Sequence, residues 1–155
     1  MRSAYVEYAS RMAKNPSQPA HDALVNAFAL LCPKDGTPMK KVPAGDGALR
    51  VNVDKCTACG AFWFDATELQ RVLAQPKAAD TLDATKGHYR HKDKAEPKDA
   101  CCPRDGARLI EVVDKKQPHV HMLTCTVCGG VLLDPGEVRD LAHFNGIERL
   151  KGFFK

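Results

Sequence analysis

Paired cysteines are the first feature of the sequence that could do chemistry. Cys56-Thr-Ala-Cys59 and Cys125-Thr-Val-Cys128 each place two thiols three residues apart, and a glycine follows each pair. A tight turn of this kind sets two donors at neighbouring corners of a tetrahedron, which is the geometry of structural zinc. The two turns therefore predict two zinc sites.

An aspartate stands upstream of each turn, where a zinc knuckle usually has its second cysteine. The motifs are Cys32-Pro-Lys-Asp35-Gly and Cys102-Pro-Arg-Asp105-Gly. Zinc accepts carboxylate oxygen, but Asp-Gly is also a common turn in which the carboxylate bonds backbone amides. Because both copies make the same change, we favour ligation and keep the plain turn as the alternative. The predicted metal ligands are Cys32, Asp35, Cys56 and Cys59 in the first site, and Cys102, Asp105, Cys125 and Cys128 in the second.

Other donors compete for the fourth position. Cys101 adjoins the second site, but the first copy has leucine at the matching place, so a spare thiol is the favoured interpretation. His119 and His121 fall on the polar face of a predicted strand and are expected to face solvent. His88 and His91 lie in a charged stretch and would reach a metal only if that stretch folded back.

Composition indicates a protein of ordinary soluble type. The chain has 155 residues, of which 27% are charged, 44% hydrophobic and only 6% aromatic, so a large single core is not expected. No secretory signal is predicted, and the longest apolar stretch, 23–32, is too short to cross a bilayer. Clustered cysteines in such a chain argue against a disulfide framework and favour metal binding or redox work. We expect a cytoplasmic protein.

The two cysteine motifs belong to an internal repeat with a period of about seventy residues. Between the motifs, Val51 and Val53 alternate with polar residues in copy one, and Val120 and Met122 do so in copy two. Period two predicts a strand with one buried face. The segments 39–42 and 109–113 are also strand-like, and turn residues separate the arms. Each copy is therefore predicted to be a β-hairpin with ligands near its ends.

A short helix is predicted after each hairpin. Asp65-Ala-Thr-Glu68 and Asp134-Pro-Gly-Glu137 match a helix start in which an N-cap acid is followed three residues later by glutamate. Apolar residues then recur at i, i+3 and i+4. A catalytic carboxylate pair is the alternative interpretation of these four acids, and helix capping is preferred.

The expected fold is a small, metal-stabilised α+β protein with two zinc-ribbon-like hairpins, each followed by a short α-helix. N-terminal helices and a charged linker complete it. The predicted layout is an N-terminal helical segment (1–31), ribbon one (32–75), a charged linker (76–100), ribbon two (101–144) and an apolar tail (145–155).

The motifs resemble the transcription factor IIB-type zinc-finger family of small, mostly prokaryotic zinc ribbons. The resemblance covers both repeats, and it departs from the family pattern at Asp35 and Asp105. It implies a zinc ribbon, with two Zn²⁺ ions per chain, and a role in binding DNA or protein. The matching residues are Cys32, Pro33, Gly36, Cys56, Cys59, Gly60, Trp63, Asp65, Glu68 and Leu69, and in copy two Cys102, Pro103, Gly106, Cys125, Cys128, Gly129, Gly130, Asp134, Gly136 and Glu137.

We therefore expect a non-enzymatic module that binds nucleic acid or a transcription-associated protein. The net charge of +4 permits nucleic-acid contact without requiring it. Trp63 and Phe64 could stack on bases, but copy two has Leu132 and Leu133 there, which favours a core role. One alternative is a zinc-dependent or thiol-redox enzyme, although neither a thioredoxin-like pattern nor His-Glu-x-x-His occurs. Another is an assembly module that forms oligomers through the terminal helices.

Overall fold

The computed structural model describes residues 29–83 and 99–143. The predicted N-terminal helices, most of the predicted linker with His88 and His91, and the apolar tail lie outside the described residues. None of the described helices is long and apolar enough to cross a membrane.

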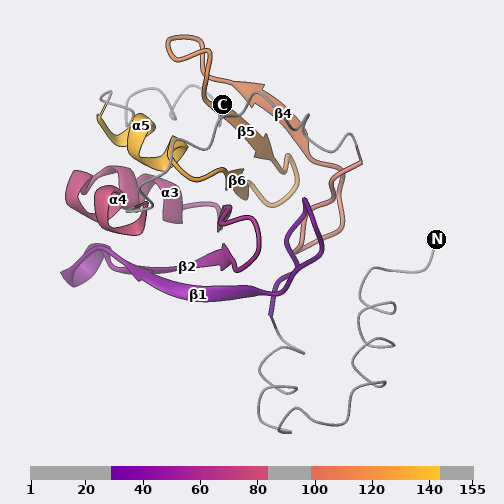
Figure 1. Cartoon of the computed structure of the whole chain (residues 1–155), viewed down its shortest axis with the longest axis horizontal. Helices are drawn as coiled ribbons and strands as arrows, with labels where there is room; N and C mark the ends of the chain where they lie inside the picture. The colour runs from indigo at the N-terminus through magenta and orange to yellow at the C-terminus, as the bar shows by residue number, and fades with distance from the viewer. Residues whose placement is uncertain (1–28, 84–98, 144–155) are drawn as a thin grey trace, which may run out of the picture.

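Repeat one forms three strands followed by helices (Figure 1). Strands β1 (Met39–Ala44) and β2 (Val51–Cys56) pair as an antiparallel hairpin, whose connection contains the short 3₁₀ helix η1 (Gly47–Leu49). Strand β3 (Phe62–Phe64) returns along β2, and helix α3 (Glu68–Leu73) follows it. Val51 and Val53 are buried on either side of exposed Asn52, and this alternation explains β2, because the face that carries the valines is covered.

Repeat two has the same order of elements. Strand β4 (Ile110–Val113) pairs with β5 (His121–Thr124), which pairs with β6 (Val131–Leu133), and helix α5 (Glu137–His143) comes next. Asp114 builds the turn between β4 and β5, since its Oδ1 accepts hydrogen bonds from the amides of Lys116 and Gln117, both at 2.8 Å.

The two repeats share one six-stranded antiparallel sheet with the order β1-β2-β3-β6-β5-β4. The join is the pairing of β3 with β6, in which Trp63 lies opposite Leu132. These two residues occupy the same position in their repeats, so the register relates the repeats by an approximate twofold axis. The expectation of two separate hairpins therefore lacked a third strand in each repeat and the join between them.

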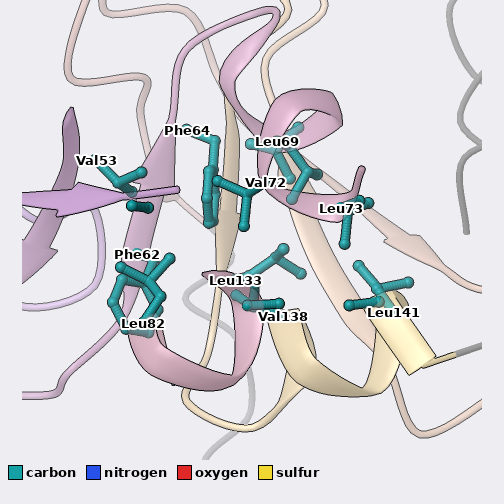
Figure 2. Packing of buried hydrophobic residues seen from close by; sticks show 14 of the residues in the cluster. Val53, Phe62, Phe64, Leu69, Val72, Leu73, Leu82, Leu133, Val138 and Leu141 are labelled. Atoms are coloured by element: carbon teal, nitrogen blue, oxygen red, sulfur yellow. The ribbon is translucent and has the colours of Figure 1, made fainter. Parts of the chain in front are cut away.

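Helices cover one face of the sheet. Figure 1 shows α3, α4 and α5 gathered at the left of the view, and Figure 2 shows their leucines and valines against Phe62 and Phe64. Strand residues with even and odd numbers point to opposite faces, so the flanking phenylalanines meet the helices while Trp63 points away from them. This core includes Val53, Phe62, Phe64, Leu69, Val72, Leu73, Leu82, Met122, Leu133, Val138 and Leu141.

The opposite face carries the predicted ligands. Trp63 and Leu132 are buried there in a second core that also contains Cys32, Cys56 and Cys102. Gly130 makes room for the indole, because an ideal Cβ on this glycine would lie 2.2 Å from Cζ2 of Trp63. One face of the sheet thus packs on helices, and the other packs on the cysteine motifs.

The prediction that a linker begins at residue 76 is wrong. Helix α4 (Pro76–Leu82) occupies it, with proline in its first turn and Ala78, Ala79 and Leu82 buried. Asp83 then ties α4 to α5, since its Oδ2 accepts a hydrogen bond from the Gly136 amide at 2.6 Å. The sequence did not predict this helix because its buried residues are mostly alanines, which show little apolar periodicity. Their small side chains nevertheless allow the helix to pack closely.

Replacing Gly130 with alanine should destabilise the protein by about 1–3 kcal/mol, because the added methyl overpacks against Trp63. In a Trp63→Leu background the same replacement should cost clearly less. Ala61 is the residue of the other repeat that matches Gly130, and this alanine is buried in the same core as Leu132, the residue that matches Trp63. Urea unfolding of the zinc-saturated single and double variants measures this coupling. Equal costs in the two backgrounds would contradict the packing.

Candidate metal centres

The first group of donors comes from two turns at the same end of repeat one. The Sγ atoms of Cys32 and Cys59 are 3.7 Å apart. The Sγ atom of Cys56 lies 3.6 Å and 3.5 Å from Oδ1 and Oδ2 of Asp35. One ligand atom from each of the four residues lies within 4.8 Å of the others.

The second group repeats this geometry. The Sγ atoms of Cys102 and Cys128 are 3.5 Å apart, and Cys125 Sγ lies 3.6 Å and 3.3 Å from the two oxygens of Asp105. The same limit of 4.8 Å holds for its four donors. In both groups the first cysteine and the central cysteine are buried, and the aspartate is exposed.

These distances fit tetrahedral zinc. Two sulfurs about 2.3 Å from a common ion lie about 3.8 Å apart at the tetrahedral angle, and a sulfur and an oxygen at about 2.0 Å lie about 3.5 Å apart. The observed sulfur pairs are 3.7 Å and 3.5 Å apart, and the closer sulfur–oxygen pairs 3.5 Å and 3.3 Å. Both donor sets could therefore hold Zn²⁺.

Backbone hydrogen bonds preset the turns. The amide of Gly36 donates to the Cys32 carbonyl at 2.8 Å, and that of Gly60 donates to the Cys56 carbonyl at 3.2 Å. Both glycines have φ in the left-handed region, 72° and 77°, which other residues rarely adopt. The Cys59 amide also points at Cys56 Sγ at 3.4 Å, an arrangement that favours a thiolate.

The aspartates make the turn considered from the sequence, and each also lies beside a cysteine of its own group. Oδ1 of Asp35 accepts a hydrogen bond from the Thr37 amide at 2.9 Å, and Asp105 accepts one from the Ala107 amide at 2.8 Å. Each carboxylate nevertheless faces a thiol of its own group. The turn therefore orients the carboxylate toward the sulfurs, so the turn and ligation are compatible. Ligation itself stays a prediction.

Charge in the first site is shared among its donors. Burial opposes ionisation of Asp35, but hydrogen bonds from Thr37 and the thiols outweigh it and hold the pKa of the carboxyl below its usual value. A hydrogen bond from the Cys32 thiol lowers the pKa of Cys59 to about 6, and the same bond, with burial, raises the pKa of Cys32. A bound cation must displace the proton held between these sulfurs, so metal affinity falls as pH falls.

Three of the rival donors, Cys101, His119 and His121, lie within the described residues and outside both groups. Cys101 is exposed, and its thiol points to the Asp99 carbonyl at 3.5 Å. His119 pairs with Asp140 at 3.2 Å, and His121 pairs with Glu111 at 2.7 Å. Among the described residues, neither histidine joins a donor group.

The acids before the helices do more than cap. Glu68 accepts a hydrogen bond from the Asp65 amide at 2.9 Å, and Glu137 accepts one from the Asp134 amide at 2.6 Å, which is half of a capping box. The predicted N-cap role of Asp65 is wrong, because α3 begins two residues later than expected and Thr67 holds the N-cap position. The carboxylate of Asp65 instead accepts a hydrogen bond from Trp63 Nε1 at 3.1 Å.

Sequence reasoning missed two basic residues inside the metal motifs. Lys34 and Arg104 hold the third position of Cys-Pro-x-Asp-Gly in repeats one and two. Lys34 Nζ bonds Asp134 at 2.6 Å, and Arg104 bonds Asp65 through Nε at 2.9 Å and a terminal nitrogen at 2.6 Å. The signal in the sequence that could have pointed to them is the positive charge that both repeats carry at this position.

Comparison with known protein families gives a match on the first repeat. Residues 31–75 match the family model described as transcription factor zinc-finger. The first repeat is therefore similar to the zinc ribbons of this family. Neither curated proteins nor solved structures gave a match. The family match and the two donor groups together support two Zn²⁺ ions per chain.

Removing both carboxylates tests their part in the sites. Asp35→Ala with Asp105→Ala should weaken zinc binding by roughly 10- to 100-fold or more, since even outer partners of a metal site commonly contribute that much. Competition with a chelator of known affinity measures the loss. Asp46→Ala removes an exposed aspartate from the β1–β2 turn and serves as the control. Unchanged zinc affinity in the double variant would refute the carboxylate ligands.

Zinc removal should unfold the face of the sheet that holds Trp63, the single tryptophan of the chain. Its indole is fully buried in the core that includes the ligand cysteines. Chelation should therefore shift tryptophan emission to longer wavelength, and added Zn²⁺, but not Mg²⁺, should reverse the shift. Emission that stays constant after complete zinc removal would contradict a structural role.

Proposed function

We propose that this protein is a non-enzymatic binding module whose two zinc ions are structural. The observation that carries this proposal is that each group brings four protein donors within 4.8 Å of one another, and that the closest sulfur–sulfur and sulfur–oxygen distances fit tetrahedral zinc. A catalytic zinc typically has three protein ligands and keeps one position open for water or substrate. A site filled by three thiolates and a carboxylate has no such position.

The same donor sets weigh against a thiol-redox enzyme. Six of the seven cysteines lie in the two groups, where zinc would engage their thiolates. The remaining thiol, that of Cys101, is exposed and would have no partner thiol to resolve a disulfide once the others hold metal.

Charge and aromatic burial favour a protein partner over nucleic acid. The chain has 23 Lys and Arg against 19 Asp and Glu, yet acidic residues outnumber basic ones within 29–83 and 99–143. Three thiolates per zinc make this part more negative still. Phe62, Trp63 and Phe64 are fully buried, so they offer no stacking platform for bases. The description of the matched family supports a partner associated with transcription.

The sheet edge formed by β4 supports protein contact. At the other edge, β1 carries exposed Lys40 and also Pro43, which are residues that block pairing with a further strand. The matching positions of β4 hold Ile110 and Val113, which are 48% and 40% exposed. The two edges therefore differ. Strand β1 carries the lysine and the proline that protect an edge, whereas β4 carries two exposed apolar residues at the matching positions.

Nucleic-acid binding provides the first test. The zinc-loaded full chain should bind labelled single-stranded DNA, duplex DNA and RNA no more tightly at 50 mM salt than a control protein of equal net charge. Fluorescence anisotropy measures these affinities. Tight binding that exceeds the control and disappears on chelation would overturn the preference for a protein partner.

The β4 edge provides the second test. Ile110→Lys with Val113→Pro copies the residues of β1 onto β4, while Leu49→Lys removes a different exposed apolar residue as the control. We expect proteins captured by the zinc-loaded chain to be lost with the β4 variant and kept with the control. Retention of the same proteins by both variants would show that β4 does not bind them.

A further inference from the structure

Two ion pairs cross between the repeats, and each begins inside a metal motif. Lys34 stands between the donors Cys32 and Asp35. Its Nζ lies 2.6 Å from both carboxylate oxygens of Asp134, which is 100 residues away in the chain. The side chains are 17% and 9% exposed, so solvent screens this pair little.

The reciprocal pair has the same plan. Arg104 stands between the donors Cys102 and Asp105, and it grips Asp65 with two parallel hydrogen bonds of 2.9 Å and 2.6 Å. Its terminal nitrogen also lies 3.7 Å from the buried carboxylate of Asp54. A bidentate pair fixes the direction of the guanidinium as well as its distance.

The two acidic partners, Asp134 and Asp65, each lie a very short stretch of chain away from the metal site of their own repeat. Asp134 directly follows β6, which begins three residues after the donor Cys128. At the start of that strand, the carbonyl of Gly130 accepts a hydrogen bond from the Cys125 amide at 2.9 Å. In repeat one, Asp65 follows β3, and the Ala61 carbonyl accepts from the Cys56 amide at 2.8 Å.

Metal binding at one site should therefore order an ion pair that holds the strand beside the other site. Three thiolates and a carboxylate repel one another when no cation holds them, so the turn around Lys34 is best fixed when its neighbours Cys32 and Asp35 bind metal. A fixed Lys34 holds Asp134 and with it the end of β6. The pair Arg104–Asp65 acts in the opposite direction, from site two to β3.

We propose that the two zinc sites fill cooperatively, with Lys34 and Arg104 as positioning residues that couple them through Asp134 and Asp65. The coupling is reciprocal, because zinc at either site must raise affinity at the other by the same factor. The protein then passes from an empty form to a two-zinc form with little of the one-zinc form. This inference does not depend on what the module binds.

Native mass spectrometry of the full chain during a buffered zinc titration counts the empty, one-zinc and two-zinc forms. Two equal, independent sites give about half of the molecules one zinc at half-saturation. We expect the one-zinc share of the wild type to be far lower. In Lys34→Met with Arg104→Met it should rise severalfold, because coupling between sites commonly amounts to roughly 5- to 150-fold in affinity.

Matched variants separate coupling from loss of charge. Lys40→Met with Arg71→Met removes the same two charges from exposed positions on β1 and α3, and should keep the wild-type distribution. Arg104→Lys keeps the charge at the coupling position but loses the bidentate pair, so it should give a one-zinc share between those of the wild type and the double methionine variant. If the double methionine variant does not fold, Lys34→Met alone removes one pair and should give an intermediate one-zinc share.

Three results would overturn the proposal. The first is a one-zinc share in the wild type at or above the value for independent sites. The second is an unchanged share when Lys34 and Arg104, or Lys34 alone, are replaced. The third is a variant whose affinities for the first and the second zinc ion both fall by the same factor. A purely structural loss would leave the ratio of these two affinities unchanged.

Discussion

The pairing of β3 with β6 is the contact on which the rest of the structure depends. Each of these strands has three residues, too few to stand alone, and each repeat buries little surface by itself. Their antiparallel register, centred on Trp63 and Leu132, turns two hairpins into one sheet. It also places both groups of donors on the same face and brings each metal motif against the acid that ends the other repeat's third strand.

The two faces of this sheet obtain their stability from different sources. Helices α3, α4 and α5 supply aliphatic side chains to one face, as in an ordinary small domain (Figure 2). The other face has cysteine turns where a larger protein would have a helix, and these turns can be held together by zinc. Trp63 is buried in the same core as cysteines of both donor groups, so the metal sites and the core of this face are expected to form or be lost together.

The donor sets could be predicted from sequence because ligand spacing is local: Cys56 and Cys59 sit in one turn, as do Cys32 and Asp35. Strand β2 was predictable from its alternating valines. The third strands were not, because three consecutive apolar residues show no period. The pairing of Lys34 with Asp134 also escaped prediction, since it joins residues 100 positions apart and depends on the register of β3 and β6. Helix α4 was missed because alanine-rich turns leave little apolar pattern.

X-ray absorption at the zinc edge, made together with zinc quantification, tests the central claim that each repeat holds zinc with three sulfurs and one carboxylate oxygen. We predict two zinc ions per chain, each with three sulfurs at about 2.3 Å and one lighter donor at about 2.0 Å. Replacing Asp35 and Asp105 with cysteine should convert both sites to four sulfurs. One zinc per chain, five or more ligands, or a spectrum that the double replacement leaves unchanged would contradict the account.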